Sequence, residues 1–176
     1  ASDTVTITAD FDEAMTSTPT INISGVVTNV LMNKISGGSA IQLGKDINGK
    51  ESSAGNSVSL SSDGTILAVA ENGFDNIRGR VGIYKFSGGS WVQLGQDIVG
   101  EAQGDNSGLD VSLSSDGLTV AIGATYNYGN GGAATHSGHA RIYRWSGTTW
   151  TQLGQDIDGE AADDHFGQSV SLSSNG

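Results

Sequence analysis

The chain lacks cysteine and has a single proline among its 176 residues. The absence of cysteine excludes disulfide bonds and thiolate metal sites, but it does not define the cellular compartment. The scarcity of proline argues against a proline-rich disordered linker. The sequence also contains no apolar run long enough to cross a bilayer.

Basic residues are also scarce, with 8 Lys and Arg against 19 Asp and Glu, for a formal net charge of −11. Nucleic acid is therefore excluded as an expected partner, because binding it depends on neutralising phosphates with basic side chains. An anionic membrane surface is disfavoured for the same reason. The 27 glycines follow no three-residue period and predict many tight turns.

Two phrases recur in step along the chain, which indicates one structural unit used several times. The copies of the first phrase begin 53 and 59 residues apart (58 to 111, and 111 to 170). The first phrase is Val-Ser-Leu-Ser-Ser-Asp/Asn-Gly at 58–64, 111–117 and 170–176, and the second is Gln-Leu-Gly-Lys/Gln-Asp-Ile at 42–47, 93–98 and 152–157.

Each complete unit predicts four short antiparallel strands. Asp63-Gly64 between strand-like runs is a strong hairpin signal. The continuous apolar run 66–70 is expected where a sheet is covered on both faces. Four strands at this period are typical of propeller blades, with Trp91 and Trp150 between neighbouring blades. The predicted strands are 57–61, 66–70, 80–86 and 91–94 in one unit, and 110–114, 118–124, 140–145 and 150–153 in the next.

Residues 1–30 belong to no repeat, and 4–11 and 20–24 alternate polar and apolar residues as half-buried strands do. This stretch, TVTITADFDEAM followed by TPTINISGVV, resembles the opening strands of immunoglobulin-like repeats in large bacterial surface adhesins. The segment 33–40 aligns with 84–91 but has lost both aromatics, which is typical of a terminal capping copy.

The repeat region resembles the FG-GAP repeats of integrin-type β-propellers. The likeness rests on Phe166-Gly-Gln-Ser-Val-Ser-Leu172 and on Ala121-Ile-Gly-Ala124, which is similar to the family's later VGAP segment. It implies an extracellular or cell-surface propeller used for adhesion or ligand display. Many such repeats carry a calcium loop between their first two strands. Here that loop is only Ser-Ser-Asp-Gly, too short and with one carboxylate, so no cofactor is expected although calcium stays possible elsewhere.

The predicted fold class is therefore all-β, a partial propeller of four-stranded blades preceded by a short immunoglobulin-like strand pair at 1–30. The propeller region 31–176 divides into a half blade at 31–50, blades at 51–101 and 102–160, and the start of a blade at 161–176. Such a chain cannot close a ring alone. We expect either further repeats of the same polypeptide, of which this is a processed or excised piece, or association of copies, or open stacking of sheets.

Long acidic connections that differ between copies are expected to gather on one face, where variable loops on a rigid scaffold carry binding sites. Simple solvated connections are the alternative. Asp46, Asp97 and Asp156 recur in every copy, which favours a role in the fold, such as an Asx turn. The variable connections are 71–79, 101–110, 125–139 and 160–168.

The candidate ligand-binding residues are four aromatic and amide side chains on one loop: Tyr126, Asn127, Tyr128 and Asn130. Such side chains bind sugars through stacking and hydrogen bonds, although a self-packed loop would use them too.

Weak metal candidates are the acidic residues Asp105, Asp163 and Asp164, for which solvation is the alternative. His136 and His139 could begin a zinc site, but a complete site needs about four ligands, so a structural or exposed role is favoured.

The sequence contains no nucleophile elbow and no convincing Ser/His/Asp set, so an enzyme is not expected. The predicted function is a non-catalytic adhesion module that binds a glycan or a protein. The alternative is a purely architectural or self-assembling segment of a giant surface protein.

Overall fold

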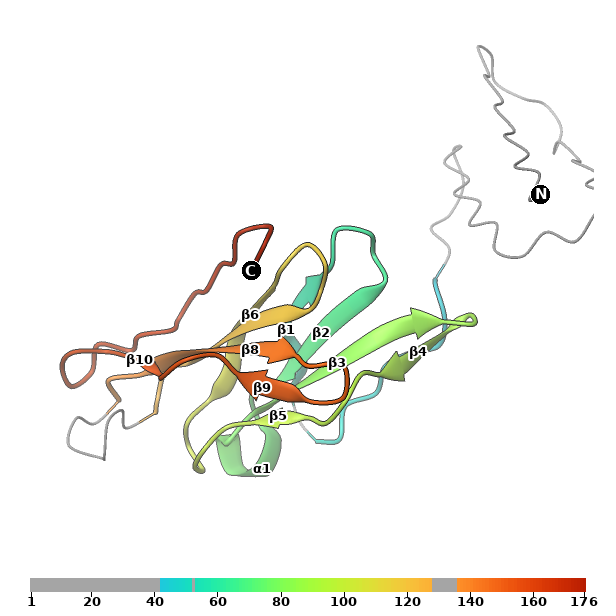
Figure 1. Cartoon of the computed structure of the whole chain (residues 1–176). Coiled ribbons are helices and arrows are strands. Elements are labelled where there is room, and N and C mark those ends of the chain that lie inside the picture. The colour runs from blue at the N-terminus through green and yellow to red at the C-terminus, as the bar shows by residue number, and fades with distance from the viewer. Residues whose placement is uncertain (1–41, 52, 128–135) are drawn as a thin grey trace, which may run out of the picture. The chain divides into compact units, whose positions relative to one another are not determined.

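The computed structural model describes residues 42–51, 53–127 and 136–176. All of them belong to the second of two units of the chain, Ile41–Gly176. The strand pair predicted within 1–30 and the start of the predicted half blade lie outside the described residues. The described part is all-β, with two antiparallel sheets (Figure 1). The connection labelled α1 (Phe74–Ile77), predicted as a loop, is a single turn in which Asp75, Asn76 and Ile77 have the positive φ values of left-handed backbone.

Each sheet contains one predicted unit, with its strands in sequence order and a fifth short strand against the third. The first sheet contains β1 (Ala54–Leu60), β2 (Ile66–Glu71), β3 (Arg80–Ser87), β4 (Ser90–Gln93) and β5 (Ile98–Val99). The second contains β6 (Ser107–Leu113), β7 (Thr119–Ala124), β8 (His139–Trp145), β9 (Trp150–Gln152) and β10 (Ile157–Asp158).

The eight predicted strands are confirmed, and the largest difference lies at the starts of β1 and β6. Both strands begin three residues earlier than predicted, at Ala54 and Ser107. Each then passes through a register shift that contains a glycine at positive φ, Gly55 at 79° and Gly108 at 83°. Such an irregularity behaves as a β-bulge and breaks the two-residue alternation from which the strand was predicted.

The hydrophobic core lies between the two sheets. Ala68 and Ala70 of β2 are fully buried, and they belong to one cluster with Val111 and Leu113 of β6. The exposures of equivalent residues show that only one face of the first sheet is covered by the second sheet. Val58 in β1 is 57% exposed, whereas Val111, at the same place in the repeat, is 5% exposed. The face of the first sheet that bears Val58 is therefore open among the described residues.

The serines of the first repeated phrase connect one unit to the next. The backbone N–H of Val111 donates to Ser57 Oγ (3.1 Å), and that of Leu113 donates to Ser59 Oγ (2.9 Å). The third copy is held on β6 in the same way, through Val170 N–H to Asp110 Oδ2 (2.9 Å) and Leu172 N–H to Ser112 Oγ (3.0 Å). Alternating short polar side chains, three serines and Asp110, thus supply polar contacts between units, while the apolar residues beside them pack.

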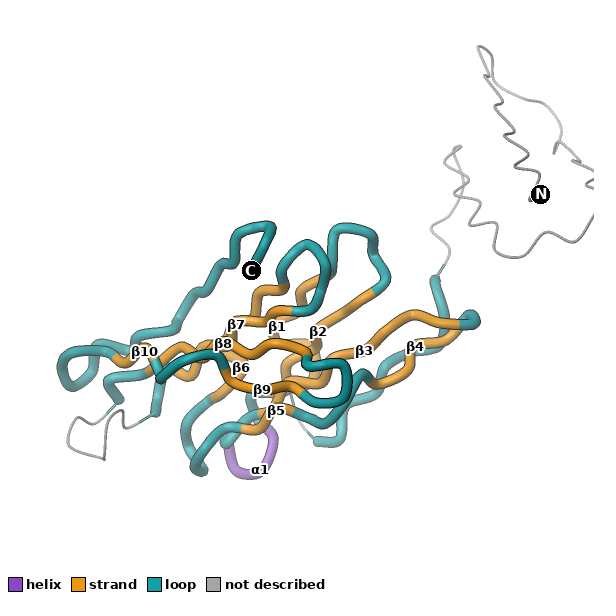
Figure 2. The backbone as a smooth tube through the Cα atoms, in the orientation of Figure 1, coloured by secondary structure: helices purple, strands orange, loops and turns teal. Residues whose placement is uncertain are grey.

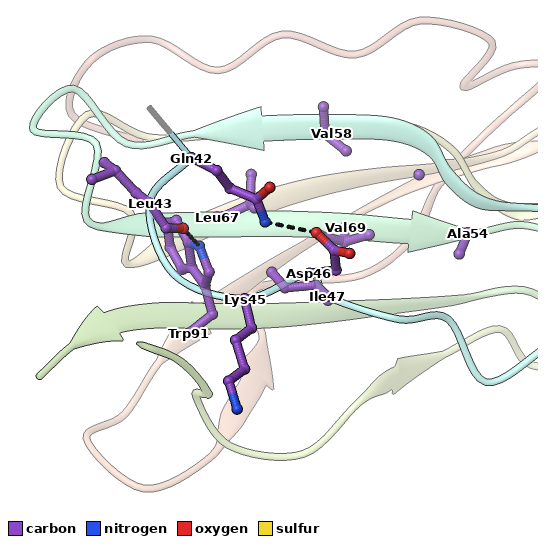
Figure 3. A pocket seen from close by; sticks show the side chains of 11 residues that line it. Gln42, Leu43, Lys45, Asp46, Ile47, Ala54, Val58, Leu67, Val69 and Trp91 are labelled. Atoms are coloured by element: carbon purple, nitrogen blue, oxygen red, sulfur yellow. Dashed lines mark hydrogen bonds between the residues drawn. The ribbon is translucent and has the colours of Figure 1, made fainter. Parts of the chain in front are cut away.

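The second repeated phrase of one unit forms hydrogen bonds with the tryptophan of the following unit. Trp150 Nε1 donates to the carbonyl oxygen of Leu94 (2.8 Å), and Gln96 pairs with the Trp150 backbone. Trp91 Nε1 donates likewise to the Leu43 carbonyl (3.0 Å), as Figure 3 shows. The expectation that both tryptophans lie between units is confirmed.

The third copy departs from the strand that its sequence repeats. Residues 170–174 carry no strand assignment and run as a loop, drawn at the C-terminal end in Figure 2. Hydrogen bonds nevertheless hold this segment beside β6 and its turn, including Ser115 N–H to Ser174 O (3.0 Å). No second strand of its own unit pairs with it among the described residues, and the ladder that would define a strand is therefore incomplete.

Candidate functional site

The connections that differ between units meet at one end of the sheets. The backbone N–H of Asn106 donates to Ile77 O (2.7 Å), which joins the unit-to-unit connection to the β2–β3 loop. One unit later, His165 N–H donates to His136 O (3.1 Å) in the equivalent manner. Tyr126 N–H donates to Asp105 O (3.2 Å), which links successive units at this end. The predicted gathering of these connections is confirmed over the described residues.

The structure separates the predicted ligand-binding residues. Tyr126 is 44% exposed, but Asn127 is 6% exposed and its side-chain amide donates to Glu101 Oε2 (3.4 Å). Asn127 therefore faces the protein rather than the open side of the loop. Tyr128 and Asn130 lie outside the described residues.

Tyr126 belongs to a cluster of three rings contributed by two connections. Its ring lies edge-on to His136 and to His165, with 5.3 Å between centroids in each case. The two imidazoles are nearly parallel, 6.2 Å apart with an interplanar angle of 19°. In the sequence His165 stands beside the acidic pair Asp163 and Asp164, but only those two carboxylates were taken as metal candidates, and the approach of His165 to His136 was not predicted.

A cavity of about 190 Å³ opens beside this cluster. Its lining mixes polar side chains with Leu109 and one exposed aromatic ring, which suits a small ligand that has both polar and apolar faces. It is lined by Asn106, Leu109, Thr125, Tyr126, His165 and Gln168.

The three acidic metal candidates have different environments. Asp105 Oδ2 accepts from the Ala102 N–H (2.7 Å), and Asp164 Oδ2 accepts from the Ala161 N–H (2.7 Å), so both close equivalent turns. Asp163 instead points its Oδ1 to within 3.4 Å of His136 Nδ1. Donor atoms of His136, Asp163 and His165 lie within 4.8 Å of one another.

A second group of possible metal ligands already surrounds a cation. Glu101, His139 and Asp156 bring their donor atoms together, but the guanidinium of Arg141 binds both carboxylates. Its Nε donates to Asp156 Oδ1 at 2.9 Å. Burial alone would raise the pKa of Asp156, but hydrogen bonds from Arg141 and Gln152 outweigh burial and hold that pKa below its usual value. This group is an ion-pair network.

Burial favours the neutral form of His139 beside this network. It is 2% exposed, and burial, followed by the charge of Arg141, lowers its pKa, while Asp156 acts in the opposite direction. Of the two histidines considered for zinc, His139 therefore has a structural role.

Acidification is expected to destabilise the domain through His139. A pKa that is lower in the folded state gives stability that is present above the unfolded pKa of about 6.5 and is lost as the pH falls toward the folded pKa. The free energy of unfolding, measured by urea denaturation from about pH 7.5 to pH 5, should decline more in the wild type than in His139→Gln. An equal decline in both proteins would assign the effect to other groups.

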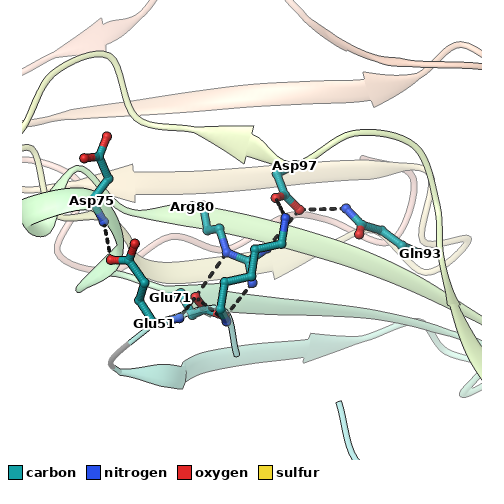
Figure 4. Close-up of polar contacts among 7 residues, drawn as sticks. Glu51, Glu71, Asp75, Arg80, Gln93 and Asp97 are labelled. Carbon is teal, nitrogen blue, oxygen red and sulfur yellow. Dashed lines mark hydrogen bonds and ion pairs between the residues drawn. The ribbon is translucent and has the colours of Figure 1, made fainter. Parts of the chain in front are cut away.

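The recurring aspartates have side-chain partners rather than the expected Asx turn. Asp97 Oδ1 accepts from Gln93 Nε2 (2.6 Å) and from Arg80 Nη1 (2.9 Å), and Arg80 also binds Glu71 (Figure 4). Asp156 accepts from Gln152 Nε2 (2.7 Å) in the same way. Their role in the fold follows from these contacts.

Compared with known proteins, the chain matches no family model, and no curated protein matches it either. No helix of the described part is both long and apolar enough to cross a membrane. The functional argument therefore rests on the residues themselves.

Proposed function

We propose that the described region is part of an FG-GAP-like β-propeller and acts as a non-catalytic binding module at the cell surface or in the extracellular space. The repeated junction supports the propeller: the third copy bonds to β6 through the positions by which β6 bonds to β1. In a propeller, each blade is placed on the preceding one in the same way, and the inner strands of successive blades lie next to one another.

The ligand in this proposal is a glycan, bound on the side of the variable connections. The exposed ring of Tyr126 at the rim of the cavity is the observation that carries it. An aromatic face can stack on a sugar ring, while the exposed amide of Gln168, which lines the same cavity, can exchange hydrogen bonds with its hydroxyls. A protein ligand would use the same rim.

Glycan binding is expected to be lost in Tyr126→Ala and largely kept in Tyr126→Phe, because stacking needs the ring and not the hydroxyl. Removing one stacking ring should weaken binding roughly tenfold or more, on the scale of about 1.5 kcal/mol for an aromatic contact. The measurement is a glycan array followed by calorimetry on any hit. Binding that is equal in both variants, or absent in the wild type, would argue against a glycan site at Tyr126.

The open face of the first sheet favours a second candidate, an architectural segment that assembles with further units. Val58 and Leu60 are exposed, although their equivalents in β6 are covered by the first sheet. The occupant that fits is another four-stranded unit of this repeat, from a second copy of the chain. Regular assemblies in electron micrographs of ligand-free protein, without any glycan signal, would favour this function.

A further inference from the structure

We propose that His136, Asp163 and His165 form a binding site for a divalent transition metal ion, best matched by Zn²⁺. This inference goes beyond the proposed glycan binding and does not depend on it. The three side chains come from two separate connections, the β7–β8 loop and the segment after β10.

The distances suit zinc. Two donors that are each about 2.0–2.1 Å from a tetrahedral zinc ion lie about 3.3–3.4 Å apart. His136 Nδ1 and Asp163 Oδ1 are 3.4 Å apart, and the donor atoms of the whole set lie within 4.8 Å. Small side-chain rotations would bring the third donor into the same sphere. Imidazole and carboxylate together suit zinc and its neighbours, whereas calcium needs six to eight oxygen ligands.

The backbone of the two connections is held in place before any ion binds. His165 N–H donates to His136 O (3.1 Å), and Phe166 N–H donates to Ser137 O (2.8 Å). Gly138 fits only because it has no side chain, since a Cβ there would lie 2.3 Å from Phe166 O. This close backbone contact fixes the separation of the two histidines.

The preceding unit shows that the fold itself does not require these side chains. Its three equivalent positions are occupied by Ile77, Gly104 and Asn106, and they share the left-handed backbone, with φ values of 64°, 92° and 58°. The corresponding values for His136, Asp163 and His165 are 53°, 64° and 52°. The same backbone is therefore built in one unit without any metal ligand, and in the next with three.

The charges around the set also fit a cation. Asp163 is 69% exposed in its side chain and is followed by Asp164, and Glu160 lies in the same connection. Arg141, a cationic side chain near this end of β8, is already bound by Asp156 and Glu101. Three protein ligands leave the fourth position of a tetrahedral ion open, as in zinc sites that accept a further ligand. His165 also lines the cavity beside Tyr126, so that position lies near the cavity.

The test is direct titration of the full chain with Zn²⁺ after removal of metals by a chelator, read by calorimetry and by competition with a chromogenic chelator. We expect one Zn²⁺ per chain, and a loss of affinity of at least tenfold in His136→Ile, Asp163→Gly and His165→Asn. Each variant carries the residue found at the equivalent position of the preceding unit, so folding should be unaffected and is verified by thermal unfolding. The matched control is Glu160→Gln, an exposed acid in the same connection, which should bind as the wild type does.

A wild type that binds no stoichiometric Zn²⁺, or variants that bind it as tightly as the wild type, would overturn the proposal. Competition by Ca²⁺ at equal concentration would likewise contradict a histidine site. Because the titration contains no glycan, its failure is distinguishable from failure of the glycan-binding proposal.

Discussion

Replacing Trp150 with alanine is expected to lower the free energy of unfolding by about 3–5 kcal/mol, the usual range for a buried tryptophan. The side chain is 4% exposed and packs against Trp145, with 5.5 Å between ring centroids. The substitution would leave a cavity between the two sheets and remove the donor to Leu94 O. Both losses occur at the junction between the two units, so the substitution should destabilise both units and not one strand alone.

The chain contains a matched control for this measurement. Trp91 occupies the same repeat position and makes the same bond to Leu43 O, but it is only half-buried because its face of the first sheet is open. Trp91→Ala should therefore cost clearly less. Trp150→Phe keeps most of the packing and should cost about 1 kcal/mol or somewhat more for the lost hydrogen bond. Equal losses in Trp91→Ala and Trp150→Ala, measured by urea denaturation, would contradict burial at the junction as the cause.

Replacing Arg80 with methionine is expected to cost about 3–5 kcal/mol, because it leaves a buried carboxylate without its counter-ion. Arg80 and Glu71 are each 2% exposed, and Arg80 Nη2 lies 2.5 Å from Glu71 Oε1. The double variant Glu71→Leu with Arg80→Met should recover much of this loss, since the fully buried carboxylate is then removed with its partner, while Asp97 keeps its ion pair with Lys50. Lys85→Met, an exposed cation on the same strand, is the control and should change stability little.

The pH dependence of the Arg80 effect can be stated with its sign. Burial alone would raise the pKa of Glu71, but hydrogen bonds from Arg80 and from the Lys50 N–H outweigh it and hold that pKa below its usual value. A lowered carboxyl pKa gives stability that is present above the unfolded pKa of about 4.3 and is lost as the pH falls through the folded value. The wild type and Arg80→Met should therefore converge only as the pH falls below the lowered folded pKa of Glu71. A constant difference down to acidic pH would mean that lost packing, and not charge, explains the variant.

The strands could be predicted because the residues that specify each hairpin are close together in the sequence and recur in the repeated phrases. The turn at Asp63-Gly64 and the alternation on either side lie within a few residues of one another, and three copies report the same pattern. The early starts of β1 and β6 could not be predicted in this way, because glycine bulges interrupt the alternation there. The turn α1 lies in the connection 71–79, whose sequence differs from that of the equivalent connection 125–139.

The site was harder to predict, because its contacts join connections that are far apart in the chain and differ in each copy. His136 and His165 meet only after the units have packed, and neither has a histidine at the equivalent position of the preceding unit. Adjacency in sequence was misleading for Tyr126 and Asn127, since the turn closed by the Asn127 N–H to Ala124 O bond exposes the Tyr126 side chain and buries that of Asn127. His136 and His139 were considered together for their spacing, but His139 belongs to the Arg141 network.

The side-chain-to-amide bonds between successive inner strands have an evolutionary consequence. They join main-chain amides to short polar side chains at the same repeat positions, Ser57 and Ser59 in one junction and Asp110 and Ser112 in the next, so a duplicated or exchanged copy would meet its neighbour through the same junction. Mutation could then rewrite the connections of one copy without disturbing how the copies join. A lineage could thus acquire histidines in a single copy while every seam between copies stayed intact.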